Sequence, residues 1–390
     1  MTRATTELEW IRLILGGGRS PGAEASGARS EPSVPEESFA VFPSAANPRL
    51  LLPLTSTKAA ASALRTRGYG VRAPARIGRA AARIGVRTGV AQRVLRTRVS
   101  LSHERPAPLV AHLRDVLGRA DLEIAIRLGR LRPNRKPVVQ ILTRDGETLA
   151  FAKLGWNGVT RELVANETRV LLGLSEQARA PRAFVAPRVV HGGRWRDLEV
   201  LVLSPLAGVP FTPRRARRDP PVEATREIAA LEHLRSARLA DSDYWRSRRS
   251  RIEHTERSGL GEIAERLEAR YGGATIPFGA WHGDWTPWNI ASRGRVVSVW
   301  DWERSGELVP VGLDAAHYDL HLALAARNLE SASIRGGPML KALRTAFDVQ
   351  SLLVALDLLE MSLRREEGRQ AGMELAESPH RRALERLVGL

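Results

Sequence analysis

Three polar side chains near the middle of the C-terminal half could together bind a metal ion and accept a proton. They are Asp284, Asn289 and Asp301. Gly283 and Pro287 should keep the first part of this stretch from being helical, since glycine is flexible and proline blocks helix propagation. We therefore expect Asp284 and Asn289 to lie in a loop, with both side chains turned toward one concave surface.

The third side chain follows a different kind of segment. Residues 296–300 read Val-Val-Ser-Val-Trp, which predicts a buried strand that ends just before Asp301. A carboxylate there could bind Mg²⁺, which prefers hard oxygen ligands and takes few of them from protein when phosphates supply the rest. The amide oxygen of Asn289 would be a second ligand, which leaves Asp284 to accept a hydroxyl proton.

These residues carry a resemblance to a known family. The order His-Gly-Asp, four residues, Asn, and then an Asp-Trp pair after a short strand resembles the aminoglycoside phosphotransferase and choline kinase branch of the kinase-like superfamily. The residues that fill these positions are His282, Gly283, Asp284, Asn289, Asp301 and Trp302. The resemblance implies an α+β, two-lobed protein-kinase-like fold. Its small lobe would be an antiparallel sheet with one helix, its larger lobe mainly helical, and an N-terminal extension would precede both.

The resemblance also implies an activity and roles for the residues. The expected activity is transfer of the γ-phosphoryl group of ATP to a hydroxyl of a small molecule, such as a sugar or another alcohol. Asp284 would take the acceptor proton, Asn289 and Asp301 would bind Mg²⁺, and His282 would fix the loop. The alternative is a catalytically inactive member that binds a nucleotide or a partner. The presence of Lys153, Asp284 and Asp301 argues against that alternative.

A kinase-like small lobe needs a strand lysine and a helix glutamate that orients it. Residues 147–154 alternate like a half-buried strand, and residues 160–174 have helical apolar spacing. Lys153 is thus the candidate lysine, and it is one of only four lysines in a chain otherwise basic through arginine. Glu167 is its expected partner. Glu162 is a rival nearer the helix start, where a carboxylate would complement the helix dipole.

Two further nucleotide contacts are expected. The apolar strand 198–203 leads into a connector at Leu203 to Leu206, and the resemblance implies that its backbone, at Leu203 and Pro205, would bind adenine. A loop at residues 129–137 could cover the phosphates through backbone amides and charge. It lacks the three spaced glycines of protein kinases, and an exposed hairpin tip would explain its basic residues nearly as well.

Other residues around the loop are expected to support it or to contact the acceptor. Asp314 best matches an aspartate that the family uses to buttress the catalytic loop. Trp285 and Trp288 could shape an acceptor pocket, because flat aromatic faces suit sugars and cations. Glu303 fits either acceptor binding or an exposed turn. The cluster Arg214, Arg215, Arg217 and Arg218 would repel a polycationic acceptor and favours a neutral or anionic alcohol.

Length and composition suggest four segments. The 390 residues accommodate a two-lobed kinase and an additional module. We expect a flexible segment at 1–37, a basic module of short strands and helices at 38–120, a small lobe at 121–206 and a helical lobe at 207–390. Zero cysteines exclude disulfides and thiolate metal sites and are compatible with a cytoplasmic location. No apolar run reaches membrane-spanning length.

The basic module could contact an anionic partner. Residues 55–98 include eleven basic and no acidic residues, and Arg76, Arg79, Arg83 and Arg87 recur at helical spacing opposite Ile77, Ala81 and Ile84. Peripheral contact with an anionic membrane or an acidic glycan is one interpretation, and a solvated face is the other. Although the net charge is +17, no nucleic-acid-binding motif accompanies it, so nucleic acid is not an expected partner.

Overall fold

The fold was analysed in a computed structural model of the chain. The structure describes residues 10–11, 37–44, 47–65, 82–88, 98–101, 109–129, 135–177, 179–255, 259–326, 328, 336–344, 347–370 and 379–389. The chain divides into two compact units. Unit 1 comprises residues 1–67, 71–168 and 187–205, and unit 2 comprises 68–70, 169–186 and 206–390.

Unit 1 is built on one antiparallel sheet whose strands differ in length. Its eight strands lie in the order β3-β1-β2-β4-β5-β6-β9-β8. The strands are β1 (Glu37–Ser44), β2 (Asn47–Pro53), β3 (Arg98–Leu101), β4 (Leu122–Arg127), β5 (Val138–Thr143), β6 (Thr148–Gly155), β8 (Val189–Trp195) and β9 (Leu198–Leu203). Three strands of the predicted basic module therefore extend the sheet of the predicted small lobe.

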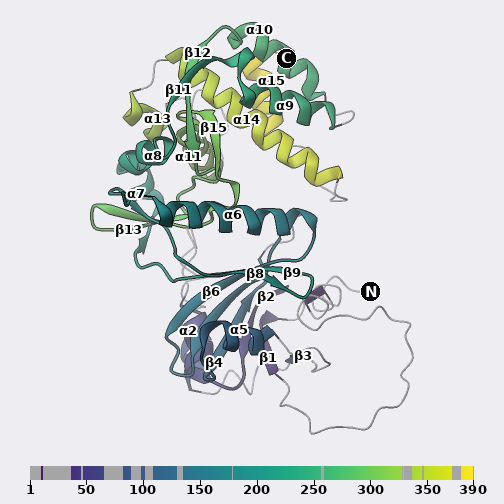
Figure 1. The fold of residues 1–390 in the computed structure, drawn as a ribbon, viewed down its shortest axis with the longest axis vertical. Coiled ribbons are helices and arrows are strands. Elements are labelled where there is room, and N and C mark those ends of the chain that lie inside the picture. Colours follow the sequence, from purple (N-terminus) through teal and green to yellow (C-terminus); the bar gives the residue numbers. More distant parts are fainter. Residues whose placement is uncertain are drawn as a thin grey trace, which may run out of the picture. The chain divides into compact units, whose positions relative to one another are not determined.

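Helices cover both faces of this sheet (Figure 1). Successive strand residues point to opposite faces, so Leu51 joins the cluster that includes helix α5 (Leu109–Leu117), whereas Leu50 joins the cluster that includes α2 (Thr57–Ala63). The alanines of α2 allow a close approach to the sheet. Ser56 caps this helix by accepting a hydrogen bond from the amide of Ala59 at 3.1 Å.

The long helix α6 (Gly158–Glu176) begins at a side-chain cap. The Asn157 side chain accepts a hydrogen bond from the amide of Thr160 at 2.9 Å, which satisfies one of the free amides of the first turn. Val164 and Leu171 are buried along one face of this helix. That face also carries Glu167, which is completely buried.

Unit 2 holds two small sheets. One has the order β10-β13-β14-β7 and the other β11-β12-β15. Their strands are β7 (Phe184–Val185), β10 (Val209–Pro210), β11 (Arg235–Arg238), β12 (Thr275–Trp281), β13 (Ile290–Arg293), β14 (Val296–Val299) and β15 (Gly306–Pro310). The chain leaves β12 just before His282 and enters β13 just after Asn289, so these two sheets fix both ends of the intervening loop.

Helices make up most of unit 2 (Figure 1). The longest, α14 (Phe347–Gln370), packs against α11 (Leu313–Ala325) through a buried run of leucines. The other helices are α7 (Pro213–Arg218), α8 (Val222–Ala229), α9 (Asp243–Glu253), α10 (Leu260–Tyr271), α13 (Pro338–Leu343), α15 (Pro379–Val388), and the short 3₁₀ turns η1 (Leu239–Asp241) and η2 (Trp302–Arg304).

The predicted fold class is confirmed: one unit is an antiparallel sheet with helices, and the other is mainly helical. The basic segment differs from its simplest interpretation. Within residues 82–87, which are helical, Ile84 is 62% exposed and Val86 is buried. Two residues along a helix are about 200° apart, so the buried side chain lies on nearly the opposite face from Ile84. Most of residues 66–97 lies outside the described residues. Among the described helices, none combines the length and apolarity needed to cross a bilayer.

Candidate active site

In unit 1, the candidate lysine and glutamate form a tight ion pair. The Nζ of Lys153 on β6 lies 2.8 and 2.6 Å from the two carboxylate oxygens of Glu167 on α6. The Glu167 side chain is fully buried and the Lys153 side chain is 12% exposed. A buried carboxylate needs such a partner, and in return it fixes the direction of the ammonium group. The rival Glu162 is exposed.

The predicted connector follows β9 directly. Leu203 is buried as the last residue of that strand and lies opposite Phe151 in β6. The amide of Ser204 donates a hydrogen bond to the carbonyl of Arg188 at 2.9 Å. Pro205 is exposed and is the last residue of unit 1 along the chain.

The loop expected to cover phosphates is only partly described. Residues 130–134, which include Arg132 and Asn134, lie outside the described residues. The Arg135 side chain is buried, donates a hydrogen bond to the carbonyl of Leu128, and packs its guanidinium 4.3 Å from the ring centre of Trp10. These contacts explain Arg135 as a structural residue of unit 1.

In unit 2, the backbone of the candidate catalytic loop is held by a buried carboxylate. Asp314, on α11, accepts hydrogen bonds from the amide of His282 at 2.7 Å and from that of Gly283 at 3.1 Å. Gly283 has φ +78°, and a Cβ there would lie 2.1 Å from the carbonyl oxygen of Arg304. Only glycine fits this tight, left-handed turn. Asp314 therefore occupies the buttressing position that the sequence suggests for it.

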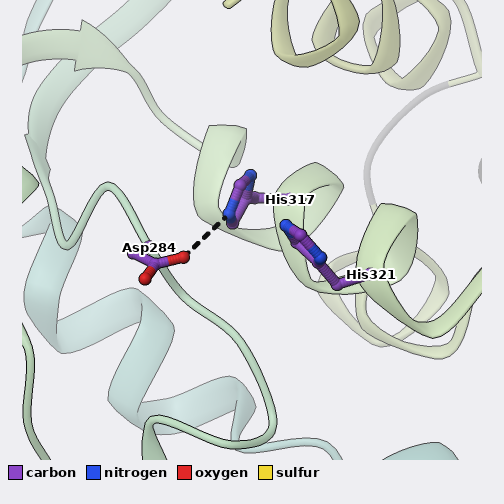
Figure 2. Close-up of side chains that lie close together, drawn as sticks. All are labelled: Asp284, His317 and His321. Atoms are coloured by element: carbon purple, nitrogen blue, oxygen red, sulfur yellow. Dashed lines mark hydrogen bonds and ion pairs between the residues drawn. The ribbon is translucent and has the colours of Figure 1, made fainter. Parts of the chain in front are cut away.

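The Asp284 carboxylate is oriented from two sides. Its Oδ2 accepts a hydrogen bond from Nδ2 of Asn289 at 2.9 Å, and its Oδ1 lies 3.4 Å from Nε2 of His317 on α11 (Figure 2). The other ring nitrogen of His317 lies 2.9 Å from Oδ1 of Asp357 on α14. Since the Asp284 side chain remains 29% exposed, an outside hydroxyl can reach it.

The pKa values of these groups follow from burial and from their partners. Burial alone would lower the pKa of His317, but the carboxylates of Asp357 and Asp284 outweigh it and raise that pKa to about 9. Burial alone would raise the pKa of Asp284, whereas the hydrogen bond and charge of His317 hold it below its ordinary value. At neutral pH Asp284 is therefore a carboxylate and His317 an imidazolium, whose other ring nitrogen faces Asp357.

Asn289 and Asp301 lie at the same end of a hairpin. β13 begins after Asn289, β14 ends at Val299, and the amide of Trp300 donates to the carbonyl of Asn289 at 3.2 Å. Asp301 follows with φ +75°, a left-handed conformation that is uncommon outside glycine and typical of functional positions. The two side chains offer only oxygen donors for a metal, and such a donor set fits Mg²⁺.

His282 is a packing residue of the loop. It is fully buried, its Nε2 lies 3.2 Å from the carbonyl oxygen of Trp300, and its ring packs edge-on against Trp285 and Trp302. Burial lowers the pKa of His282 to about 4, so the ring is neutral at pH 7.

The tryptophans of the loop divide between core and surface. Trp285 is completely buried, so the expectation that it contacts an acceptor is wrong and it belongs to the core. Trp288 is 37% exposed and packs edge-on against His321, with ring centres 5.0 Å apart. Trp302, which follows Asp301, is completely buried.

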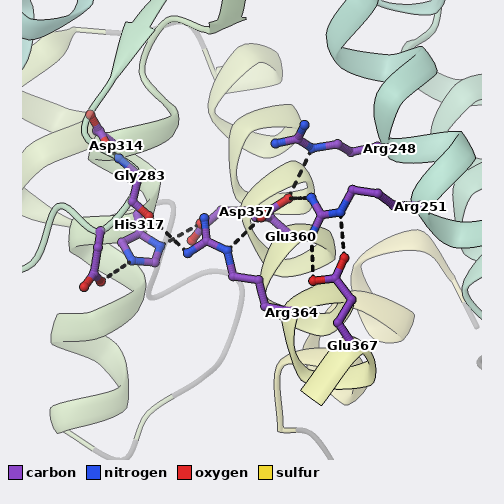
Figure 3. Close-up of polar contacts among 10 residues, drawn as sticks. Arg248, Arg251, Gly283, Asp314, His317, Asp357, Glu360, Arg364 and Glu367 are labelled. Atoms are coloured by element: carbon purple, nitrogen blue, oxygen red, sulfur yellow. Dashed lines mark hydrogen bonds and ion pairs between the residues drawn. The ribbon is translucent and has the colours of Figure 1, made fainter. Parts of the chain in front are cut away.

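A buried ionic network braces the loop from behind (Figure 3). Arg364 on α14 donates to the carbonyl of Gly283 at 3.0 Å and to Glu360 at 2.7 Å. Glu360 is also within 3.1 Å of Arg248 and 2.7 Å of Arg251, both on α9. The loop is thus tied to α11 by Asp314 and to α14 by Arg364.

Sequence reasoning missed His317, His321, Asp357, Glu360 and Arg364. A signal existed only for the histidines, which are four residues apart in an apolar helical stretch and so share one face of α11. Asp357, Glu360 and Arg364 lie on α14, about 70 to 80 residues beyond the loop, and no local pattern links them to it.

No protein-family model matches the chain, and no curated protein matches it in sequence. Several solved structures are similar. The apo form of a thermostable mutant of aminoglycoside phosphotransferase APH(4)-Ia aligns over 72% of this chain and 98% of its own, with 14% identity and a TM-score of 0.47. A choline/ethanolamine kinase family protein from Mesorhizobium loti aligns over 69% and 86%, with 16% identity and a TM-score of 0.43.

A third similar structure is amicoumacin kinase hAmiN in complex with AMP-PNP, Ca²⁺ and its ligand Ami. It aligns over 69% of this chain and 87% of its own, with 11% identity and a TM-score of 0.42. All three similarities are remote, so the fold and the proposed function rest on the elements and side chains of this chain.

Proposed function

We propose that the protein is an ATP-dependent phosphotransferase that acts on a hydroxyl group of a small molecule. The observation that carries this proposal is the environment of Asp284: an ionised carboxylate, partly exposed, and held in one orientation by Asn289 and His317. Phosphoryl transfer passes through a loose transition state, so positioning of the acceptor hydroxyl matters more than its deprotonation. A base in this reaction therefore needs a fixed direction more than a high pKa.

The other residues have complementary roles in this proposal. Lys153, with its direction set by Glu167, binds the α and β phosphates of ATP. Asn289 and Asp301 hold Mg²⁺, which neutralises charge on the phosphate oxygens when bound. Asp284 takes the proton of the acceptor hydroxyl. The backbone around Leu203 and Pro205 binds the adenine.

The acceptor is proposed to be a neutral or anionic alcohol, for example a sugar. Arg214, Arg217 and Arg218 are exposed on α7, and their charges would repel a polycation. Arg215 packs on Phe211 and lies 3.5 Å from Asp219, so it is partly committed to local structure.

The test is Mg²⁺-dependent ATP turnover over a panel of sugars, amino alcohols and aminoglycosides, compared between wild type and Asp284→Asn. Loss of the base should lower kcat by at least about 10²-fold while nucleotide binding, followed by calorimetry, persists. Asp243→Asn is the matched control, because Asp243 is exposed on α9 and should leave turnover unchanged. A wild-type protein that neither binds ATP nor transfers its phosphate would contradict the proposal.

A further inference from the structure

Next to the proposed base lies a second group of potential metal ligands. One ligand atom from each of Asp284, His317 and His321 lies within 4.8 Å of the other two. Figure 2 shows the two imidazole rings on successive turns of α11, both beside the carboxylate of the loop. Two histidines four residues apart on one helix face are a frequent zinc-binding arrangement.

His317 has the outer partner that a metal-binding histidine usually has. Its Nδ1 lies 2.9 Å from Oδ1 of Asp357, and both side chains are 1% exposed. Metal-bound histidines generally use one ring nitrogen for the metal and donate the other N–H to a carboxylate, which fixes the ring. The remaining nitrogen of His317, Nε2, is the atom that faces Asp284.

His321 supplies an independent observation. Its Nε2 is buried and has no hydrogen-bond partner among the described residues. A buried polar atom without a partner is costly and therefore calls for an explanation. Its ring packs edge-on against His317, with ring centres 4.4 Å apart, and against Trp288. The contacts hold the ring in place but leave this nitrogen unused.

We propose that Asp284, His317 and His321 form a binding site for a transition-metal ion of the Zn²⁺ class, and that its occupation inhibits the enzyme. Two imidazole nitrogens with one carboxylate select Zn²⁺ and similar ions over Mg²⁺, which prefers oxygen donors. This site therefore differs in chemistry from the one at Asn289 and Asp301. Binding displaces the proton between His317 and Asp284 and releases it to solvent.

Ligand atoms around tetrahedral zinc are about 3.4 Å apart, given bond lengths near 2.1 Å. Asp284 and His317 already meet this separation at 3.4 Å, so the main adjustment falls on His321. Three protein ligands leave a fourth position open. Inhibition rests on the proposed function, because the metal would occupy the Asp284 oxygen needed for the acceptor proton. Binding itself does not rest on it.

The direct test is titration of the tag-free, full-length protein with Zn²⁺, and with Co²⁺ as a spectroscopic probe, without nucleotide or Mg²⁺. We expect one high-affinity ion per chain and a visible Co²⁺ band typical of four-coordinate nitrogen and oxygen ligands. His321→Gln should raise the Kd for Zn²⁺ at least tenfold. His233→Gln is the control. Because His233 is exposed and is not one of the three proposed ligands, its loss should leave the Kd for Zn²⁺ unchanged.

Because His317→Gln removes a buried ion-paired residue and could unfold the chain, His321→Gln at the edge of the site is the deciding variant. In turnover assays, the Zn²⁺ concentration for half inhibition should rise with the Kd. The proposal is overturned if Zn²⁺ does not bind, or if His321→Gln binds it as tightly as wild type and the His233→Gln control do. If Zn²⁺ binds and His321→Gln weakens the binding, but the wild-type protein transfers no phosphate, only the proposed function is overturned.

Discussion

Lys153 belongs to the candidate active site and also contributes to the stability of the fold. Its ammonium group has two short bonds to a carboxylate that is completely buried. Removing one partner of such a pair leaves an uncompensated buried charge, which is far more costly than losing an exposed pair. Lys58 offers a direct contrast, because it pairs with Asp145 at 2.6 Å while both side chains are mostly exposed.

We expect Lys153→Met to lower kcat/KM for ATP by about 10²-fold, because the phosphates lose a charged donor. The free energy of unfolding should fall by about 3 kcal/mol, because Glu167 becomes an unpaired buried carboxylate. Adding Glu167→Gln should restore most of the stability and none of the activity. Steady-state kinetics and urea unfolding measure both effects. Lys58→Met should change neither beyond about 1 kcal/mol, and equal effects of the two lysine variants would refute this account.

At the scale of elements, the candidate catalytic loop takes its shape from its neighbours. Two sheets fix its ends, Asp314 of α11 binds its first amides, and Arg364 of α14 binds the carbonyl of Gly283. Gly283 is the point at which these constraints meet. Its positive φ and its closeness to the backbone of Arg304 leave no room for a side chain.

Gly283→Ala tests this geometry against Gly294→Ala. Both glycines have positive φ, +78° and +70°, but a Cβ at Gly294 would meet nothing within 4 Å. We expect Gly294→Ala to cost about 1 to 2 kcal/mol from backbone strain alone. Gly283→Ala should cost about 4 kcal/mol or more, since a backbone carbonyl must also move. Urea unfolding compares the two, and similar costs would mean that the loop relaxes freely.

At the scale of the whole molecule, the many arginines need carboxylates to compensate their charge, and one such carboxylate lies beside the candidate catalytic loop. The net charge is +17, and arginine supplies most of it. In unit 2, Glu360 compensates three arginines from two helices, Arg248, Arg251 and Arg364. Burial alone would raise the pKa of Glu360, but Arg364, Arg248 and Arg251 together hold it below its ordinary value.

We expect Glu360→Gln to destabilise the protein by about 3 kcal/mol at pH 7, because buried guanidinium groups lose their counter-charge. A lowered folded-state pKa contributes stability that is complete above the unfolded pKa and is lost as pH falls toward the folded pKa. The difference between wild type and Glu360→Gln should therefore shrink between pH 5 and about pH 3. Urea unfolding at several pH values measures it.

The control for this prediction is Glu223→Gln. Glu223 forms an exposed pair with Arg226 on α8, and its loss should cost less than about 0.5 kcal/mol at any pH. If Glu360→Gln behaved like Glu223→Gln, the network would contribute specificity of packing and little net stability.

Sequence alone determined much of this protein. Hydrophobic alternation predicted β6, a continuous apolar run predicted β9, and helical spacing predicted α6 to within two residues at each end. The residues around Asp284, Asn289 and Asp301 predicted a loop for the first two and a strand that ends before the third, because turn and strand geometry are local properties. The pairing of Lys153 with Glu167, for which Glu162 was a rival, followed from the family resemblance and not from the spacing alone.

Only the tertiary structure decided what surrounds Asp284. Its partner His317 comes from α11, and the residue behind that, Asp357, comes from α14, 73 positions further along the chain than Asp284 itself. It also placed Trp285 in the core and joined strands β1 to β3 to the sheet formed by β4, β5, β6, β8 and β9. Such contacts depend on how helices pack after the chain has folded back on itself, and a one-dimensional pattern contains no trace of which distant face a side chain will meet.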